Sequence, residues 1–253
     1  MRGAADRLGH GGEGGAAAAY SPLVVWHDVE CGRYTADLPL WRELAAREHG
    51  PVLDVGAGTG RVALDLARRG HDVIALDREA DLLAALAERA NGLPVATVTA
   101  DATDFALERR FGLIIVPMQT IQLLPERAGF LAAARRQLRP GGLLALAITA
   151  ATEDFGELEE LPAPDTGAAG GWRFASQPTA VRALPGATRI ERIRRAIAPD
   201  GSVTDEDDVI ELAHLTVPAL EAEGRAAGFA PEAARTIPET EEHVGSEVVM
   251  LRA

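Results

Sequence analysis

The stretch VLDVGAGTG, Val52 to Gly60, decides how the chain folds. A short apolar run ends beside an acid, and glycines then occupy alternate positions at Gly56, Gly58 and Gly60. Glycine adopts backbone angles that other residues avoid and lets a ligand approach the main chain closely. The stretch therefore predicts a buried strand, a bare loop and a helix N-terminus, an arrangement that binds nucleotides at the carboxyl edge of a parallel sheet.

Strands and helices alternate on both sides of this stretch. Near-continuous apolar strands indicate a parallel sheet that is covered on both faces. We expect an α/β fold: a doubly wound, mostly parallel seven-stranded sheet with helices on both faces and a small antiparallel insertion after strand five. The predicted strands are Pro51–Val55, His71–Leu76, Val95–Thr99, Phe111–Val116 and Leu143–Thr149, and the predicted helices are Arg61–Arg69, Ala80–Ala90 and Glu126–Leu138, the last followed by a sharp turn over residues 139–142.

The pattern changes after the fifth strand. Residues 153–171 are acidic and then rich in proline and glycine, which predicts a loop. Two strands around a turn at Pro199–Gly201, a helix after Thr216 and two final strands complete the chain. We divide it into a flexible tail over residues 1–19 and a single domain over 20–253, made of a helical cap (20–50), a core expected to bind a cofactor (51–150), an insertion with antiparallel strands (151–212), and a C-terminal helix with strands (213–253).

Composition narrows the class of partner. The formal net charge of −13 and the lack of a basic stripe argue against a nucleic-acid partner, whose phosphates require Lys and Arg. The apolar runs are too short for a membrane span, and no signal-peptide core follows the N-terminus, so we expect a cytoplasmic protein. The single Cys31 and the absence of a metal-ligand spacing predict no metal. We expect a small-molecule partner; a monomer and a homodimer both remain open.

Two classes of cofactor use a glycine loop after a strand. The dinucleotide pattern G-x-G-x-x-G would place its third glycine at position 61, where this chain has Arg61. The order D-x-G-x-G-x-G that begins at Asp54 instead resembles motif I of class I S-adenosylmethionine (SAM)-dependent methyltransferases of the small-molecule type. Acids at the ends of the next two predicted strands, Asp77 and Asp101, and the L-x-P-G-G before strand five strengthen the resemblance, which covers Tyr34 to Thr149 well.

The resemblance implies SAM as cofactor and S-adenosylhomocysteine (SAH) as product. Asp77 would meet the ribose hydroxyls, and Asp101 and Ala102 the adenine; the end of strand four would lie beside the methyl group. The cofactor-binding residues that we expect are Tyr34, Asp54, Gly56, Ala57, Gly58, Gly60, Asp77, Arg78, Asp101, Ala102, Pro117 and Met118.

Structural alternatives remain open for several of these residues. Asp77 could cap the next helix, and Asp101 could cap a helix or stabilise a turn. Asp54 could bind the N–H groups of the glycine loop or the ammonium of the cofactor. Tyr34 could pack in the core or close over the carboxylate of the cofactor.

The acceptor of the methyl group is expected to be an N or O nucleophile of a small molecule, attacked in line with the bond that breaks. The sequence lacks the Asn/Asp-Pro-Pro-Tyr signature of nucleic-acid amino methyltransferases and has PMQT after strand four. We expect Gln119, Thr120 and Gln122 to contact the acceptor. No catalytic residue is identified, although His27 and His214 are candidate bases.

Two other functions remain open at this stage. An NAD(P)-dependent oxidoreductase could use a similar sheet, although Arg61 and the lack of a catalytic Tyr-x-x-x-Lys pair weigh against it. A non-catalytic protein could keep the fold only to bind SAM.

Overall fold

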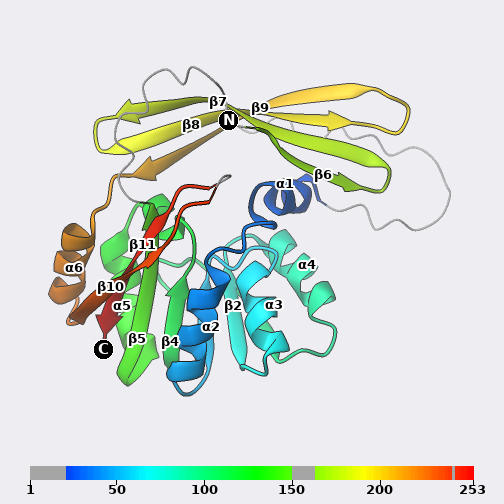
Figure 1. Cartoon of the computed structure of the whole chain (residues 1–253). Coiled ribbons are helices and arrows are strands. Elements are labelled where there is room, and N and C mark those ends of the chain that lie inside the picture. Colours follow the sequence, from blue (N-terminus) through cyan, green and yellow to red (C-terminus); the bar gives the residue numbers. More distant parts are fainter. Residues whose placement is uncertain (1–20, 150–162, 241–242) are drawn as a thin grey trace.

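The computed structural model describes residues 21–149, 163–240 and 243–253. A seven-stranded sheet forms its centre, and a four-stranded sheet lies over one end of it (Figure 1). The predicted tail over residues 1–19 and the acidic stretch over residues 153–162 lie outside the described residues.

The seven-stranded sheet has the strand order β10-β11-β5-β4-β1-β2-β3. Strands β1 to β5 pair in parallel, and β11 runs antiparallel to both β5 and β10. The chain therefore winds outward in one direction from β1 and in the other from β4, as the doubly wound prediction requires. The strands are β1 (Val52–Val55), β2 (Val73–Asp77), β3 (Val95–Thr99), β4 (Phe111–Val116), β5 (Leu138–Thr149), β10 (Ala230–Ile237) and β11 (Ser246–Arg252).

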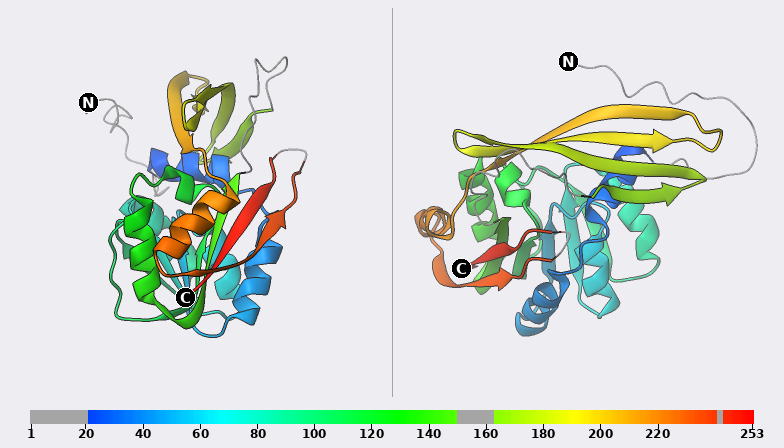
Figure 2. Two further views of the ribbon diagram at one scale, coloured as in Figure 1. Left: turned by 90° about the vertical axis from the view of Figure 1, so that its left-hand side faces the viewer. Right: turned by 45° about the horizontal axis from the view of Figure 1, so that its top comes forward.

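Helices cover both faces of this sheet (Figure 2). Alternate residues of each strand face opposite sides, so Val52 packs in one buried cluster and Leu53 in the other. The first cluster includes α2 (Leu38–Arg47), α3 (Arg61–Arg68) and α4 (Ala80–Ala90), and the second includes α5 (Arg127–Gln137) and α6 (Val217–Ala226). The prediction of an α/β fold with two covered faces is confirmed.

The four-stranded sheet, which we call the roof, is antiparallel throughout and has the order β6-β7-β8-β9. Its strands are β6 (Asp165–Ala169), β7 (Trp172–Leu184), β8 (Ala187–Ile197) and β9 (Val203–Ala213). It stands above the end of the large sheet to which α1 (Pro22–Cys31) is also attached (Figures 1 and 2).

Two strands of the roof correct the sequence prediction. The loop predicted to extend to Gly171 contains β6, whose small residues pair with β7 and pack on α1 so closely that a side chain at Gly167 would contact Val29. The pattern also missed β7, because Pro178 lies in its interior and proline removes a ladder hydrogen bond. The structure accommodates Pro178 at a shift in register between Pro178 and Ala180. The turn predicted at Pro199–Gly201 is confirmed between β8 and β9.

Two further elements differ from the prediction. Helix α1 was not predicted, because its apolar residues serve separate neighbours: Val24 packs with α4, whereas Trp26 contacts Phe174 of the roof. The predicted turn over residues 139–142 is instead the start of β5. Its backbone is held there because the Gly141 N–H donates to the Ala253 carbonyl, and the Ala253 N–H donates to Gly142.

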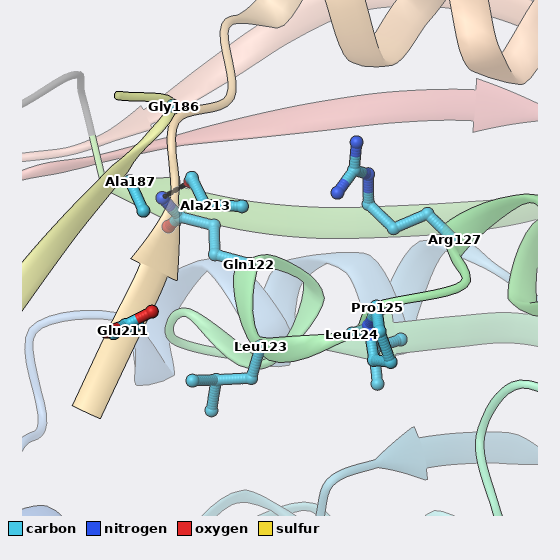
Figure 3. A pocket seen from close by; sticks show the side chains of 9 residues that line it. All are labelled: Gln122, Leu123, Leu124, Pro125, Arg127, Gly186, Ala187, Glu211 and Ala213. Atoms are coloured by element: carbon cyan, nitrogen blue, oxygen red, sulfur yellow. Dashed lines mark hydrogen bonds between the residues drawn. The ribbon is translucent and has the colours of Figure 1, made fainter. Parts of the chain in front are cut away.

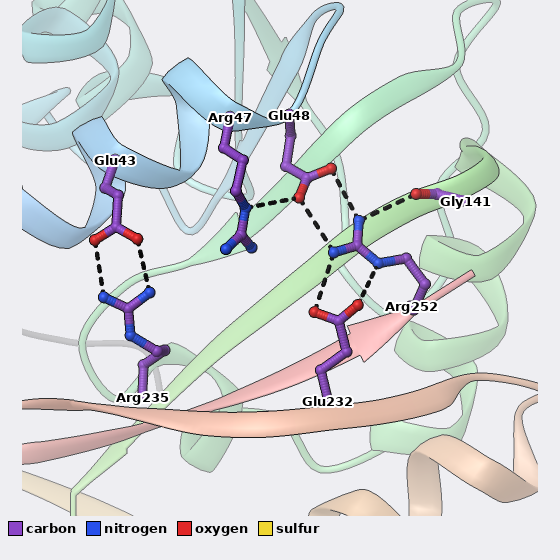
Figure 4. Close-up of polar contacts among 7 residues, drawn as sticks. All are labelled: Glu43, Arg47, Glu48, Gly141, Glu232, Arg235 and Arg252. Atoms are coloured by element: carbon purple, nitrogen blue, oxygen red, sulfur yellow. Dashed lines mark hydrogen bonds and ion pairs between the residues drawn. The ribbon is translucent and has the colours of Figure 1, made fainter.

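Ion pairs attach α2 to the C-terminal strands β10 and β11 (Figure 4). The Arg252 guanidinium bridges Glu48 at the end of α2 and Glu232 of β10, while Arg235 pairs with Glu43 nearby. These contacts link residues from opposite ends of the sequence. In the described ranges, no helix has the length and apolar character needed to cross a membrane.

Candidate active site

The glycine loop lies between β1 and α3, next to the point where the strand order reverses between β1 and β4. Gly56, Gly58 and Gly60 have positive φ angles of 72°, 54° and 92°. A Cβ atom on Gly56 would lie 2.5 Å from Cγ2 of Thr120, and one on Gly58 would lie 2.1 Å from Nε2 of His27. Both backbone angle and space therefore demand glycine at these two positions.

Asp77 at the end of β2 supports this loop. Its Oδ2 accepts a hydrogen bond of 2.8 Å from the Gly58 N–H, and its Oδ1 accepts one of 3.0 Å from the Glu79 N–H. A carboxylate offers about four acceptor positions, so the contacts with the backbone leave room for ribose hydroxyls. The neighbouring Arg78 is exposed and pairs with Glu79.

Asp54 lies beneath the loop and is 1% exposed. Burial raises its pKa to about 7, although the nearby charge of Arg61 acts in the opposite direction. Its Oδ1 is buried and has no hydrogen-bond partner among the described residues. Because a buried acceptor without a partner is costly, this oxygen fits a ligand that supplies a donor, such as the ammonium of SAM.

Asp101 follows β3 and is exposed. Its Oδ1 accepts hydrogen bonds of 2.7 Å from both the N–H and the hydroxyl of Thr103, and the side-chain bond to Thr103 lowers the pKa of Asp101. The turn that the sequence left open as an alternative is therefore present. Ala102 is half-buried and packs against the second core cluster. Contact of either residue with adenine stays a prediction.

The segment after β4 enters a short 3₁₀ helix, η1 (Thr120–Leu123). Met118 has a φ of +54°, an angle that residues with side chains rarely adopt. The Thr120 hydroxyl donates to the Pro117 carbonyl, and its methyl group covers Gly56. Such strained backbone gathers at ligand sites, so Met118 is consistent with the predicted position beside the cofactor.

Gln122 is buried at a cavity of about 270 Å³ between η1 and the roof (Figure 3). Its Nε2 donates to the Ala213 carbonyl at 2.9 Å, and its Oε1 accepts from the N–H and hydroxyl of Thr149. The side chain therefore joins the end of β5 to the end of β9. Gln119 is half-buried, and the contact of these two residues and Thr120 with an acceptor stays a prediction.

Helix α1 closes over the glycine loop. His27 Nδ1 lies 3.2 Å from the Thr59 hydroxyl, which donates to Asp28 Oδ1 at 2.7 Å. Arg89 of α4 pairs with both oxygens of Asp28. His27 was predicted as a candidate base from the sequence, whereas Asp28, Thr59 and Arg89 were not predicted to belong to the site. Thr59 lies inside the glycine motif, whereas no local pattern marks the other two.

His214 occupies a different place. Its Nε2 lies 2.9 Å from the hydroxyl of Thr188 in the roof, and its N–H donates to the Gly186 carbonyl. The structure thus brings only one of the two candidate bases to the glycine loop.

Tyr34 belongs to the cap, between α1 and α2, and contacts His243 of the C-terminal segment. It is 6% exposed, its ring centre is 4.8 Å from that of His243, and the Arg61 guanidinium lies over its ring. It is thus packed in the core, and contact with the carboxylate of SAM stays a prediction. Among the described residues, no group of His, Cys, Asp and Glu side chains is arranged to hold a metal ion.

Comparison with known proteins identifies the domain. Residues 52–142 match the family model of a methyltransferase domain. This match confirms the predicted methyltransferase domain over these residues, which contain the glycine motif and the strand-end acids Asp77 and Asp101. A search of curated proteins found no significant match.

Solved structures resemble nearly the whole chain. A sugar N-methyltransferase from Streptoalloteichus sp. ATCC 53650 has 22% identity and a TM-score of 0.71, covering 97% of this chain and 98% of its own. A SAM-bound amino pentose methyltransferase from Micromonospora echinaspora, involved in calicheamicin biosynthesis, has 23% identity and a TM-score of 0.68, covering 90% and 97%. A glycopeptide N-methyltransferase complexed with SAH has 24% identity and a TM-score of 0.60, covering 85% and 86%. At these identities the likeness establishes the fold.

Proposed function

We propose that this chain, which carries a methyltransferase domain, is a SAM-dependent enzyme that methylates the amine nitrogen of a sugar. The observation that carries the proposal is the extent of the likeness. The match with the sugar N-methyltransferase covers 97% of this chain. The residues outside the match are too few to contain the roof or α1. Because the roof stands over the edge of the sheet where nucleotides bind, it is the part that would hold an acceptor.

Acidic side chains near this edge favour an amine over a hydroxyl group. Asp165 of β6 is half-buried, and burial raises its pKa. Its side chain makes no hydrogen bond among the residues that the structure describes, whereas its backbone belongs to the pairing of β6 with β7. Asp77 adds further negative charge at the end of β2, beside the loop. A protonated amino sugar would be attracted to these groups, whereas a neutral alcohol would gain little.

SAM supplies an activated methyl group on a sulfonium. The chain's own residues contribute binding and orientation: the glycine loop provides close main-chain contact, Asp77 offers acceptors to the ribose, and Asp54 offers one to the ammonium. Correct placement of the acceptor can lower the barrier by about 7–11 kcal/mol. We assign the remaining cofactor contacts to Tyr34, Arg78, Asp101, Ala102, Pro117 and Met118, and the acceptor contacts to Gln119, Thr120 and Gln122.

The two alternative functions are less well supported. The domain match does not favour an NAD(P)-dependent oxidoreductase, and Arg61 stands where the dinucleotide pattern needs glycine. A non-catalytic SAM-binding protein would share the fold. It differs from the proposal in one measurable respect, since it would bind SAM without transferring the methyl group.

Calorimetric titration with SAM, SAH and NAD tests the cofactor. We expect both sulfur compounds to bind and NAD to fail. Asp77→Ala should weaken SAM about 10–100-fold, since it removes acceptors that carry charge. Asp72→Ala is the matched control, because Asp72 lies before the opposite end of β2 and pairs with Arg109. Equal affinity of the two variants would contradict the assignment of Asp77.

Transfer of a labelled methyl group to a panel of sugars tests the acceptor. The panel should pair methyl glycosides of amino-deoxyhexoses and aminopentoses with the matching alcohols. Label on the amino sugars alone supports the proposal. Label on the alcohols would contradict the choice of nitrogen, and SAM binding without any transfer would favour the non-catalytic alternative.

A further inference from the structure

His27 and Asp28 reach the glycine loop from α1 through one shared hydroxyl. The Thr59 hydroxyl lies 2.7 Å from Asp28 Oδ1 and 3.2 Å from His27 Nδ1. Burial alone would raise the pKa of Asp28, but the hydrogen bonds from Arg89 and Thr59 outweigh it and lower the pKa below its usual range. Asp28 is therefore an ionised carboxylate, which can only accept hydrogen bonds.

The direction of these bonds determines the tautomer of His27. Thr59 has one hydroxyl proton, and it points to Asp28. The hydroxyl oxygen must then accept at its other contact, so His27 Nδ1 carries the proton that it donates to Thr59. In a neutral imidazole, the remaining nitrogen, Nε2, consequently has a free lone pair.

His27 is neutral at physiological pH, because burial lowers its pKa. Its charged surroundings only partly offset this effect: Asp28 and Glu30 of α1 and Asp77 of β2 raise the pKa, whereas Arg61 of α3 lowers it. Nε2 faces Gly58 and makes no hydrogen bond with any residue in the described ranges. A neutral imidazole with one oriented nitrogen and one free nitrogen is the form that a general base requires.

We propose that His27 Nε2 is the general base that removes a proton from the ammonium of the acceptor. The inference rests on the proposed N-methyltransferase function. An ammonium has no lone pair; once its proton moves to Nε2, the nitrogen lone pair forms the bond to the methyl carbon. The electron pair of the breaking carbon–sulfur bond stays on sulfur, which becomes a thioether. The imidazolium then returns its proton to water.

Thr59 and Asp28 act as positioning residues in this scheme. They fix the ring orientation and tautomer, while Arg89 anchors Asp28 from α4. On the other side of α1, Glu30 accepts hydrogen bonds of 2.7 Å from the Nε and Nη2 of Arg194. The helix that carries His27 is thus held at both the loop and the roof.

Heteronuclear NMR of the histidine side chains tests the tautomer without any acceptor. In the free protein and in its SAH complex, we expect His27 at neutral pH to carry its proton on Nδ1, and its pKa to lie below the ordinary histidine value of 6.5. Thr59→Val should abolish the tautomer preference, and Thr59→Ser should restore it. A proton on Nε2, or a charged ring at neutral pH, would overturn the proposal.

Kinetics with the amino-sugar methyl glycosides test the base itself. His27→Asn keeps a donor at the place of Nδ1 but removes Nε2, and we expect kcat to fall about 10²–10⁴-fold with the acidic limb of the pH profile lost. His71→Asn, at the opposite edge of the sheet, is the matched control and should retain full activity. An unchanged kcat for His27→Asn would overturn the assignment. It would also be overturned if His214→Asn lost activity by about 10²–10⁴-fold while His27→Asn did not.

Calorimetry separates this failure from a failure of the proposed function. If SAM and SAH do not bind the unmodified chain, the methyltransferase proposal fails as a whole. If they bind, and the amino sugar is methylated equally by the unmodified chain and His27→Asn, only the role of His27 is wrong.

Discussion

Arg61 and Asp37 form a two-pronged ion pair, with Nη1–Oδ1 and Nη2–Oδ2 distances of 2.6 and 2.7 Å. The side chains are 10% and 1% exposed, so the pair is buried between α3 and α2. The Trp41 indole also donates to Asp37, which completes the contacts of its carboxylate. The residue directly after the glycine loop is therefore attached to the helical cap.

Replacing Arg61 by Met should destabilise the protein strongly, because Asp37 would stay buried without its partner. Loss of one member of a buried pair typically costs about 3–5 kcal/mol in the free energy of unfolding. Urea denaturation would measure it. The exposed pair of Arg235 with Glu43 provides a control, and Arg235→Met should change stability little (Figure 4). Equal effects of the two substitutions would contradict the structural role of Arg61.

Gly58→Ala should impair SAM binding more than a glycine substitution elsewhere at positive φ. The new Cβ would lie 2.1 Å from His27 Nε2, so the ring or the loop must move. Gly70→Ala and Gly92→Ala are matched controls, since both have positive φ and no atom within 4 Å of the added Cβ. Calorimetry with SAH and thermal denaturation would separate the clash from backbone strain. We expect the controls to lose only stability, by about 1 kcal/mol.

Asp54 should impose a distinctive dependence of stability on pH. Its pKa is about 7 in the folded chain and near its ordinary value of 3.8 in the unfolded chain. Between these values the folded state holds a proton that the unfolded state has lost, so the free energy of unfolding falls as pH rises. Asp54→Asn should remove this part of the slope in urea midpoints measured across the window.

Asp65 offers a control of opposite sign. The hydrogen bond from Arg42 lowers the pKa of Asp65, so its contribution to stability is lost as pH falls. If Asp65→Asn and Asp54→Asn changed the slope in the same direction, the assignment for Asp54 would be wrong.

Gln122→Leu should loosen the attachment of the roof to the large sheet. The substitution removes the bonds to Thr149 and Ala213 and leaves buried backbone groups unpaired, at a cost of about 1–3 kcal/mol. Hydrogen exchange of the Thr149 and β9 amides should accelerate. Gln119→Leu is the control, since the Gln119 side chain makes no hydrogen bond among the described residues. Unchanged exchange in Gln122→Leu would show that this link is dispensable.

The sequence was most informative where local pattern and tertiary packing agree. Residues 95–99 and 111–116 are strands at their predicted limits, and α4 begins and ends as expected, because apolar runs and helical spacing mark these elements locally. Gly56 and Gly58 were identified from spacing alone, and their backbone angles explain why.

The remaining parts depend on contacts between distant residues. β6 is a strand only because β7 pairs with it, and Pro178 concealed β7 itself. His27 could be predicted as a candidate base, but its tautomer depends on Thr59 and Asp28. Asp28 in turn forms an ion pair with Arg89, which lies 61 positions later in the sequence. No pattern within a short window contains such information.

Helix α1 has a consequence for the design of chimaeras. It contacts the glycine loop through Asp28 and the roof through Glu30, yet the roof lies more than a hundred residues later in the chain. Exchanging only residues 163–213 with a relative would leave Glu30 facing a foreign surface in place of Arg192 and Arg194. A graft intended to change acceptor specificity therefore needs two separate cassettes, α1 and the roof, transplanted together.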